Sequence, residues 1–190
     1  MTAPHWRTIP MQHQRSNHRF SMRRVAALCL AGGLGFFGTL TAATAAADKA
    51  DTMYVTKAAA AGMMEVQASQ VAITRASNPD VRAFAQRMVK DHTAVGDELK
   101  TLAGQKGITV PDSLPADERA KVDKLNTLEG AKFDRTYADE VGVKAHKEAV
   151  SLFDQASKHA KDPDIKAFFT HNLPALREHL QMAQQLKSAK

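Results

Sequence analysis

The stretch Asn78-Pro-Asp-Val-Arg-Ala-Phe84 recurs further along the chain as Asp162-Pro-Asp-Ile-Lys-Ala-Phe168. Each copy begins with an Asn or Asp that can cap a helix, followed by a proline that fits the first helical position. The next residue is an Asp, which suits the positive end of a helix. Both copies follow a long helical pattern, so the sequence predicts two helical hairpins with equivalent turns.

Apolar residues recur at spacings of three and four along the rest of the chain, and no stretch alternates as a strand would. This periodicity predicts long helices over residues 49–76, 79–105, 131–159 and 163–186, with a short helix over 116–128. We therefore expect one all-α domain over residues 48–190. Its fold should be a ferritin-like four-helix bundle, in which a long crossover containing the short extra helix joins the two hairpins.

Charge is distributed unevenly along the chain. Residues 1–47 hold five of the 26 basic residues and none of the 20 acidic residues. The net charge of +6 therefore belongs mostly to this segment, and the remaining chain is almost neutral. Its basic and acidic residues are interspersed, which disfavours a nucleic-acid-binding role because that role needs a clustered basic surface.

The same basic segment has the order of an export signal. Arg23 and Arg24 precede an apolar run too short for a permanent membrane span, and small residues then follow up to Ala47. We expect a signal peptide over residues 1–47, cleaved after Ala45 or Ala47, and a mature chain in the periplasm. Translation from Met22 is an alternative start, and the paired arginines leave twin-arginine export open.

The mature chain lacks the residues and motifs of several chemistries. Cys29 is the only cysteine and lies in the leader, so no thiolate remains for catalysis or metal binding. The sequence also lacks a Gly-rich phosphate loop, a His-Glu-x-x-His motif, a calcium loop and a Gly-x-Ser-x-Gly motif. These absences disfavour an enzyme without deciding the question.

Each long helix carries one polar residue that interrupts its apolar face. These residues are Glu65, His92, His146 and His179. In a bundle they can converge near the axis, where one carboxylate and three imidazoles form a ligand set for zinc, iron or copper. The residues expected to orient a histidine from outside this cluster are Asp91, Asp139 and Glu178.

A buried hydrogen-bonded network is the alternative explanation for these four residues, and the pattern alone favours it. A ferritin-type di-iron centre is disfavoured, because positions 89, 143 and 176 are Val, Val and Leu where that pattern requires Glu. If the histidines share an ion, their ring nitrogens must lie within about 5 Å of one another.

Methionines near two of the histidines suggest a variant of the metal hypothesis. Met88 and Met182 share helix faces with His92 and His179, and a thioether with an imidazole suits copper(I). Methionine also fills gaps in helical cores, and that explanation is the simpler one.

Several segments carry a resemblance to a known family. They are Ser77–Asp80, Phe84–His92, Gly130–Tyr137, His146 and Leu173–His179. Together they resemble a bacterial exported, ferritin-like family described as a domain of unknown function and often labelled as outer membrane proteins. The resemblance covers residues 51–187. It implies a four-helix fold and an exported location, and it supplies no activity and no catalytic residues.

The sequence therefore favours an exported helical bundle with a non-enzymatic binding role or a protective role in envelope stress. A transition-metal-binding protein that uses the Glu and His cluster is the alternative, and any cofactor would be a transition metal ion. The sequence names no partner. The mature chain has no transmembrane segment, and peripheral association with the envelope and self-association both stay open.

Overall fold

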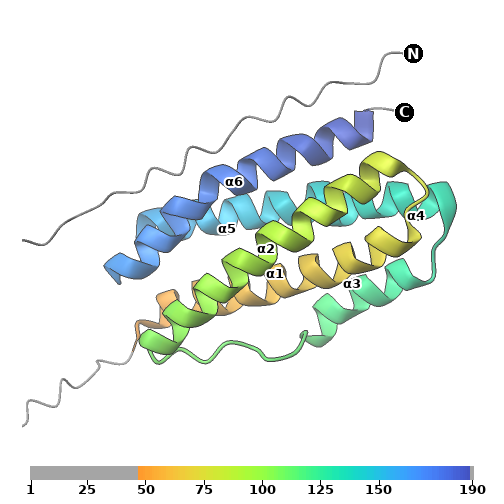
Figure 1. Cartoon of the computed structure of the whole chain (residues 1–190). Helices are drawn as coiled ribbons and strands as arrows, with labels where there is room; N and C mark the ends of the chain where they lie inside the picture. Colours follow the sequence, from red (N-terminus) through yellow and green to blue (C-terminus); the bar gives the residue numbers. More distant parts are fainter. Residues whose placement is uncertain (1–46, 189–190) are drawn as a thin grey trace, which may run out of the picture. The chain divides into compact units, whose positions relative to one another are not determined.

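The computed structural model describes residues 47–188, which form a bundle of helices (Figure 1). Most of the expected export signal lies outside these described residues. The elements in chain order are α1 (Lys49–Arg75), α2 (Pro79–Gln105), α3 (Ala116–Asn126), α4 (Gly130–Thr136), the π-helical segment η1 (Tyr137–Ala145), α5 (His146–His159) and α6 (Pro163–Ser188). The predicted all-α fold is confirmed, because every regular element in the described part of the chain is helical.

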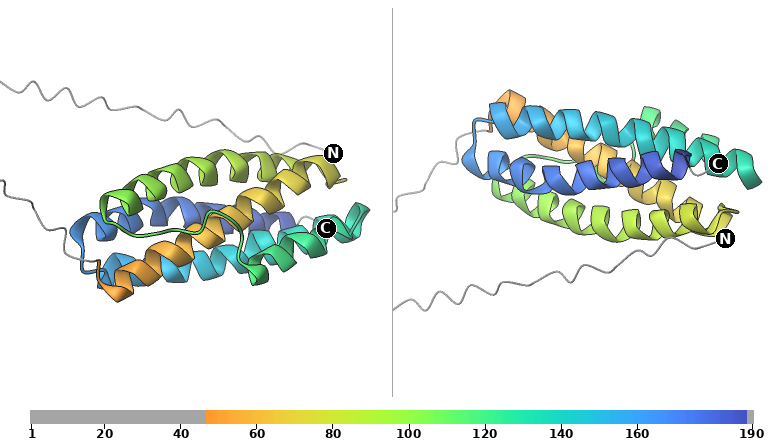
Figure 2. Two further views of the ribbon diagram at one scale, coloured as in Figure 1. Left: turned by 90° about the horizontal axis from the view of Figure 1, so that it is seen from below. Right: turned by 90° about the horizontal axis from the view of Figure 1, so that it is seen from above.

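The helices pair as two hairpins. Helix α1 packs along α2, and α5 packs along α6. Elements α4, η1 and α5 follow one another without a break, so they form the third long helix of the bundle (Figure 2). The crossover between the hairpins runs across α1 and leads into α3, which packs beside α1. This is the predicted ferritin-like arrangement. None of the helices within residues 47–188 is both long and apolar enough to cross a bilayer.

The repeated turns cap their helices as the sequence predicts. The Asn78 side chain accepts a hydrogen bond from the backbone N–H of Asp80 at 2.8 Å. The Asp162 side chain accepts from the backbone N–H of Asp164 at 2.9 Å and from that of Ile165 at 3.1 Å. Each bond satisfies a donor that would otherwise lack a partner at the start of a helix.

A buried carboxylate from the second hairpin also holds the turn of the first. Asp134 on α4 accepts from the backbone N–H of Ser77 at 3.0 Å and from that of Asn78 at 2.9 Å. It also accepts from the Ser77 hydroxyl. The α1–α2 turn is thus fastened to the third long helix.

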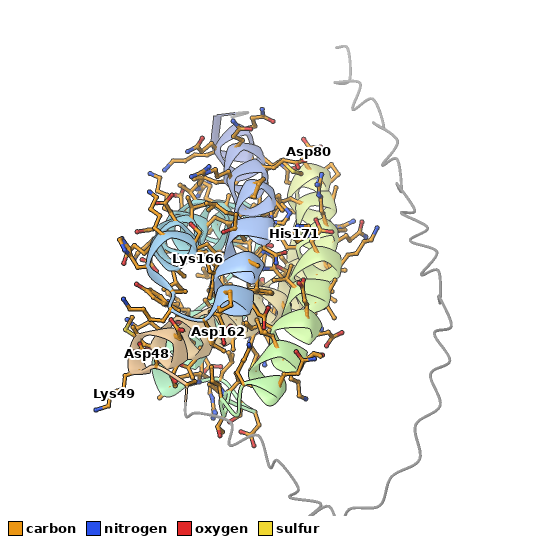
Figure 3. The ribbon with its side chains drawn as sticks, turned by 90° about the vertical axis from the view of Figure 1, so that its left-hand side faces the viewer. Asp48, Lys49, Asp80, Asp162, Lys166 and His171 are labelled. Carbon is orange, nitrogen blue, oxygen red and sulfur yellow. The ribbon has the colours of Figure 1, made fainter. Side chains whose placement is uncertain are left out.

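The first hairpin holds the second in the same way at the other end of α1. Asp51, in the first turn of α1, accepts from the backbone N–H of Lys161 at 2.9 Å and from that of Asp162 at 2.8 Å. Figure 3 shows the start of α1, marked by Asp48, beside the turn that contains Asp162. We call Asp51 and Asp134 the two clamps, because each fastens the turn of the opposite hairpin.

The apolar core falls into two clusters with a polar layer between them. One cluster is built around Phe153, Phe168 and Phe169, and the other around Phe133 and Tyr137. On α2, on the third long helix and on α6, the change from one cluster to the other falls at the histidine. The fold therefore places the polar residues of different helices at one level of the bundle.

Candidate metal centre

Four helices bring the sequence-predicted ligands into one buried layer. The exposed fractions are 1% for Glu65 on α1, 6% for His92 on α2, 0% for His146 at the start of α5 and 2% for His179 on α6. The centroids of the three imidazole rings lie 5.3 to 5.6 Å apart. One nitrogen of each ring lies within 4.8 Å of the others, which meets the distance condition for a shared ion.

The two nitrogens of His92 face different partners. Nδ1 lies 3.1 Å from Oε2 of Glu65, and Nε2 lies 3.3 Å from Nε2 of His146. A carboxylate on Nδ1 keeps the hydrogen of a neutral imidazole there, because the carboxylate only accepts. The Nε2 of His92 therefore presents a lone pair toward His146.

His146 is oriented by the backbone of the π-helical segment. Its Nδ1 donates to the carbonyl oxygen of Val141, five residues earlier, at 3.0 Å. Oε1 of Glu65 lies 3.4 Å from the same nitrogen, but this buried oxygen has no hydrogen-bond partner within the described chain. Because the Nδ1 hydrogen goes to Val141, Nε2 of His146 also presents a lone pair.

His179 is held from the outer side of the layer. Its Nε2 lies 3.0 Å from Oδ2 of Asp91, an oxygen that also accepts from Nε of Arg87 at 3.1 Å. The Nδ1 of His179 is buried and has no hydrogen-bond partner among residues 47–188. Because the Nε2 hydrogen goes to Asp91, Nδ1 of His179 also offers a free lone pair.

The three rings share one arrangement. Each has an acceptor on one nitrogen, from Glu65, Val141 or Asp91. One nitrogen of each ring also lies within 4.8 Å of a nitrogen of each of the other two rings. Two of these lone pairs face each other across 3.3 Å. Acceptors on the outer nitrogens of histidines are typical of metal sites, where they fix the ring and raise its basicity.

Burial favours the neutral form of two of these imidazoles, those of His92 and His179. It lowers the pKa of His92, and the nearby Glu65 carboxylate offsets only part of the effect. Burial, together with the positive charge that His92 can carry, lowers the pKa of His179 to about 4. Burial alone would raise the pKa of Asp91, but hydrogen bonds from Arg87 and His179 lower it. At neutral pH His92 and His179 are therefore neutral nitrogen donors, and the Asp91 carboxylate beside His179 is ionised.

The structure separates the residues that the sequence grouped as outer partners. Asp91 lies against His179. Glu178 pairs instead with Arg87 at 3.0 Å, and Asp139 pairs with Lys187 at 2.9 Å. Sequence reasoning missed the carbonyl of Val141, because a backbone oxygen is available only where the helix changes its hydrogen-bonding pattern and no residue type announces that change.

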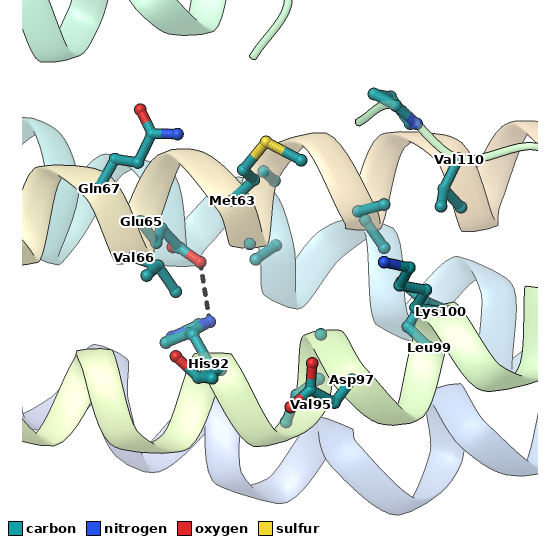
Figure 4. Close-up of a pocket in the computed structure, with 18 of the residues that line it drawn as sticks. Met63, Glu65, Val66, Gln67, His92, Val95, Asp97, Leu99, Lys100 and Val110 are labelled. Carbon is teal, nitrogen blue, oxygen red and sulfur yellow. Dashed lines mark ion pairs between the residues drawn. The ribbon is translucent and has the colours of Figure 1, made fainter. Parts of the chain in front are cut away.

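A cavity of about 400 Å³ opens between α1 and α2 and reaches this layer. Its lining includes Glu65 and His92 at the inner end, and Gln67, Asp97 and Lys100 among its exposed residues. Figure 4 shows Glu65 reaching from α1 to His92 on α2, with the ion pair between them drawn as a dashed line. The polar layer is thus buried but borders open space on one side.

Comparison with known proteins places the chain in a family. The sequence profile of the family described as "Domain of unknown function (DUF4142)" matches residues 38–186. The chain belongs to this family. This agrees with the resemblance to a family of unknown function that the sequence showed. No curated protein matched the sequence significantly.

Solved structures share the fold of the DUF4142 chain. A DUF305 fragment from Deinococcus radiodurans superposes with a TM-score of 0.67 at 13% identity, over 77% of this chain and all of the fragment. CopM in its Cu(I)-bound form gives 0.60 at 16% identity, over 73% of this chain and 95% of CopM. The Cu(II)-bound form gives 0.61 at 14% identity over the same shares. At these identities the likeness concerns the fold.

Proposed function

We propose that the protein binds a single transition metal ion through His92, His146 and His179, and that it holds this ion after export to the periplasm. The observation that carries the proposal is the direction of the three rings. One nitrogen of each ring has its own acceptor, which leaves a lone pair on the other, and one nitrogen of each ring lies within 4.8 Å of the others. Glu65 supports the site from outside His92.

The geometry suits a four-coordinate ion. With metal–nitrogen bonds of about 2.0–2.1 Å, two nitrogens 3.3 Å apart subtend about 105–110° at the ion, close to the tetrahedral angle. Two metal–nitrogen bonds span at most about 4.2 Å. Two ring nitrogens that lie further apart than this therefore come within reach of one ion by a small rotation of one ring. Imidazole donors suit copper, zinc and iron, and Cu²⁺ binds most tightly among the divalent ions.

A purely structural network explains the layer less well. It leaves the Nδ1 of His179 and Oε1 of Glu65 buried without hydrogen-bond partners in the described structure. It also leaves two lone pairs facing each other between His92 and His146. A cation between the rings removes the repulsion and gives His179 its missing partner. A structural neighbour with the same fold, CopM, was solved with copper bound, which supports the choice of ion to test first.

The periplasmic location is part of the proposal. Its support is the order of residues 1–47, with paired arginines, an apolar run and then small residues up to Ala47. Amino-terminal sequencing of the protein recovered from a periplasmic fraction tests it. We expect the first residue to be Ala46 or Asp48, and a chain that stays in the cytoplasm with residues 1–47 intact would contradict the location.

The central test is metal content and metal affinity. Elemental analysis of the protein from a periplasmic fraction is expected to find a single transition metal ion per chain. Titration of the chelator-treated protein should show saturable binding, with Cu²⁺ tighter than Zn²⁺. Bound ion should also raise the thermal midpoint, because it binds only the folded chain. A protein that carries no transition metal and gives no binding heat with Cu²⁺, Zn²⁺ or Fe²⁺ would overturn the proposal.

Replacing Glu65 with glutamine is expected to weaken the binding of Cu²⁺ by about 10–100-fold, the usual effect of losing an outer hydrogen-bond partner of a metal-bound histidine. Glutamine keeps the volume of the side chain but removes the charge that supports His92. Isothermal titration of the Glu65→Gln variant measures the change.

Two other carboxylates provide matched controls for this variant. Glu178→Gln and Asp139→Asn also remove a charge, but these residues pair with Arg87 and Lys187 rather than with a histidine. Their affinity for Cu²⁺ should stay close to that of the original protein. If Glu178→Gln and Glu65→Gln weaken Cu²⁺ binding equally, the loss of affinity comes from the overall loss of negative charge and not from the contact between Glu65 and His92.

A further inference from the structure

An ion that binds at the three histidines must pass through the bundle, because the rings are almost completely buried. The cavity between α1 and α2 is the open space that reaches this layer, since Glu65 and His92 both form part of its wall. The buried carboxylate of Glu65 has one oxygen without a hydrogen-bond partner in the described residues. Asp97 is the exposed carboxylate of the cavity wall, and Glu65 is the buried one, with an acceptor free to contact a cation.

Two glycines at facing positions create this space. Gly62 lies three residues before Glu65, and Gly96 lies four residues after His92, so both share the helix face of the polar layer. A Cβ atom built at either position meets no atom within 4 Å. A side chain at either position would start in open space, and because both glycines line the cavity, the absence of side chains there keeps the passage to Glu65 open.

The opposite approach to the histidines, between α2 and α6, is covered. Arg87 donates to Asp91 at 3.1 Å and to Glu178 at 3.0 Å, which ties the two helices together over His179. The guanidinium is positively charged and repels an incoming cation. Entry on this side would also break the hydrogen bond between Asp91 and His179.

We propose, resting on the metal-binding function above, that the cavity between α1 and α2 is the entry route of the metal ion and that Glu65 receives the ion before the histidines bind it. Gly62 and Gly96 keep the route open. The route determines how fast the ion enters and leaves. The three histidines and their outer partners determine how tightly it is held.

Filling the cavity tests this assignment. In the Gly62→Leu and Gly96→Leu variants, a leucine occupies the space next to Glu65 and His92. Both changes replace glycine inside a helix with a better helix former, so the variants should fold at least as stably. Gly104→Leu is the matched control, because Gly104 lies on the same helix as Gly96, also has open space around its Cβ position, and lies outside the cavity wall.

Stopped-flow mixing of the purified metal-free protein with Cu²⁺ alone measures entry, and a competing chelator measures release. We expect the rates of Cu²⁺ entry and release to fall by about tenfold or more in each cavity variant, because the ion can then pass only after the cavity wall rearranges. The equilibrium dissociation constant should stay within about threefold, because a narrowed route changes both rates by the same factor. Gly104→Leu should leave both rates unchanged.

The outcomes separate the route from the site. If the original protein binds no Cu²⁺ at equilibrium, both the function and the route are overturned. If it binds Cu²⁺ and the cavity variants enter at the original rate, the function stands and the route is overturned. The proposed route would also be overturned if Cu²⁺ entered the Arg87→Gln variant faster and Gly96→Leu left the entry rate unchanged. That result would place the route between α2 and α6.

Discussion

Replacing His179 with alanine is expected to weaken the binding of Cu²⁺ by more than about a hundredfold, beyond the loss that removal of an outer partner causes. The change removes one of three inward nitrogens. It leaves no orphaned charge, because Asp91 keeps its hydrogen bond from Arg87 at 3.1 Å. The fold should therefore survive a change that removes the site.

The same helix provides the control for this variant. His171 also lies on α6, but its side chain is exposed and lies outside the polar layer (Figure 3). His171→Ala should bind Cu²⁺ as tightly as the original protein. Titration calorimetry compares the two directly. Similar affinities in His171→Ala and His179→Ala would show that the ion does not bind at the buried rings.

Metal-dependent stability gives a second measurement of the same effect. An ion present at about a thousandfold above its dissociation constant stabilises the folded protein by about 4 kcal/mol. A hundredfold loss of affinity in His179→Ala reduces this gain to about 1.4 kcal/mol at the same ion concentration. The thermal midpoint of the variant should thus respond only weakly to Cu²⁺, whereas that of His171→Ala should respond fully.

Variants with two substitutions test whether the histidines act as one site. His92→Ala/His179→Ala should bind Cu²⁺ only slightly more weakly than either single variant, because the site is already lost after the first change. Residues that share a partner show such non-additive effects. If the losses of Cu²⁺ binding free energy in the two single variants add fully in the double variant, the histidines belong to two separate weak sites. The close approach of the three rings does not support that arrangement.

The order and length of the helices could be predicted from the sequence because local signals define them. The repeated Asn-Pro-Asp and Asp-Pro-Asp turns satisfy donors at the starts of α2 and α6, so they determine where these helices begin. The π-helical segment η1 could not be predicted, because its residues are compatible with an ordinary α-helix. In the fold this segment packs closely against α6, where a Cβ atom on Gly142 would lie 3.0 Å from the Cβ of Ala183.

The members of the polar layer could also be found from the sequence, since a polar residue on an apolar helix face stands out. What the sequence could not supply is the role of each member. The sequence predicted Glu65 as a ligand and Asp91 as an outer partner, and in the fold each carboxylate lies against a nitrogen of one histidine. That distinction depends on which ring nitrogen faces which neighbour, and this follows from side-chain direction in the folded bundle. The two clamps were missed for the same reason, because their partners are backbone N–H groups far away in the sequence.

Replacing Asp51 with alanine is expected to lower the free energy of unfolding by about 3 kcal/mol, since it removes the buried, charged acceptor of two backbone donors. Those donors are the N–H groups of Lys161 and Asp162 in the α5–α6 turn. Asp134→Ala should cost a similar amount, because it removes the acceptor for Ser77 and Asn78. Urea unfolding of the metal-free variants measures both changes.

An exposed carboxylate in the same turn serves as the control. Asp164 pairs with Lys106 at 2.6 Å on the surface, where its side chain is 68% exposed. Surface ion pairs contribute at most about 1 kcal/mol, so Asp164→Ala should change the free energy of unfolding by no more than that. A loss in Asp164→Ala as large as that in Asp51→Ala would mean that the turn is stabilised by general charge and not by its hydrogen bonds to the buried Asp51 carboxylate.

The two clamps should act independently, because they lie near opposite ends of α1. This helix has 27 residues and is therefore about 40 Å long, whereas effects of substitutions more than about 10 Å apart usually add. Asp51→Ala/Asp134→Ala should then lose about 6 kcal/mol, which is comparable with the whole stability of a small domain. We expect this double variant to be largely unfolded without metal. A double variant that loses no more than either single variant would show that the two clamps act as one unit and not independently. Variants as stable as the original protein would show that the apolar faces alone hold the hairpins together.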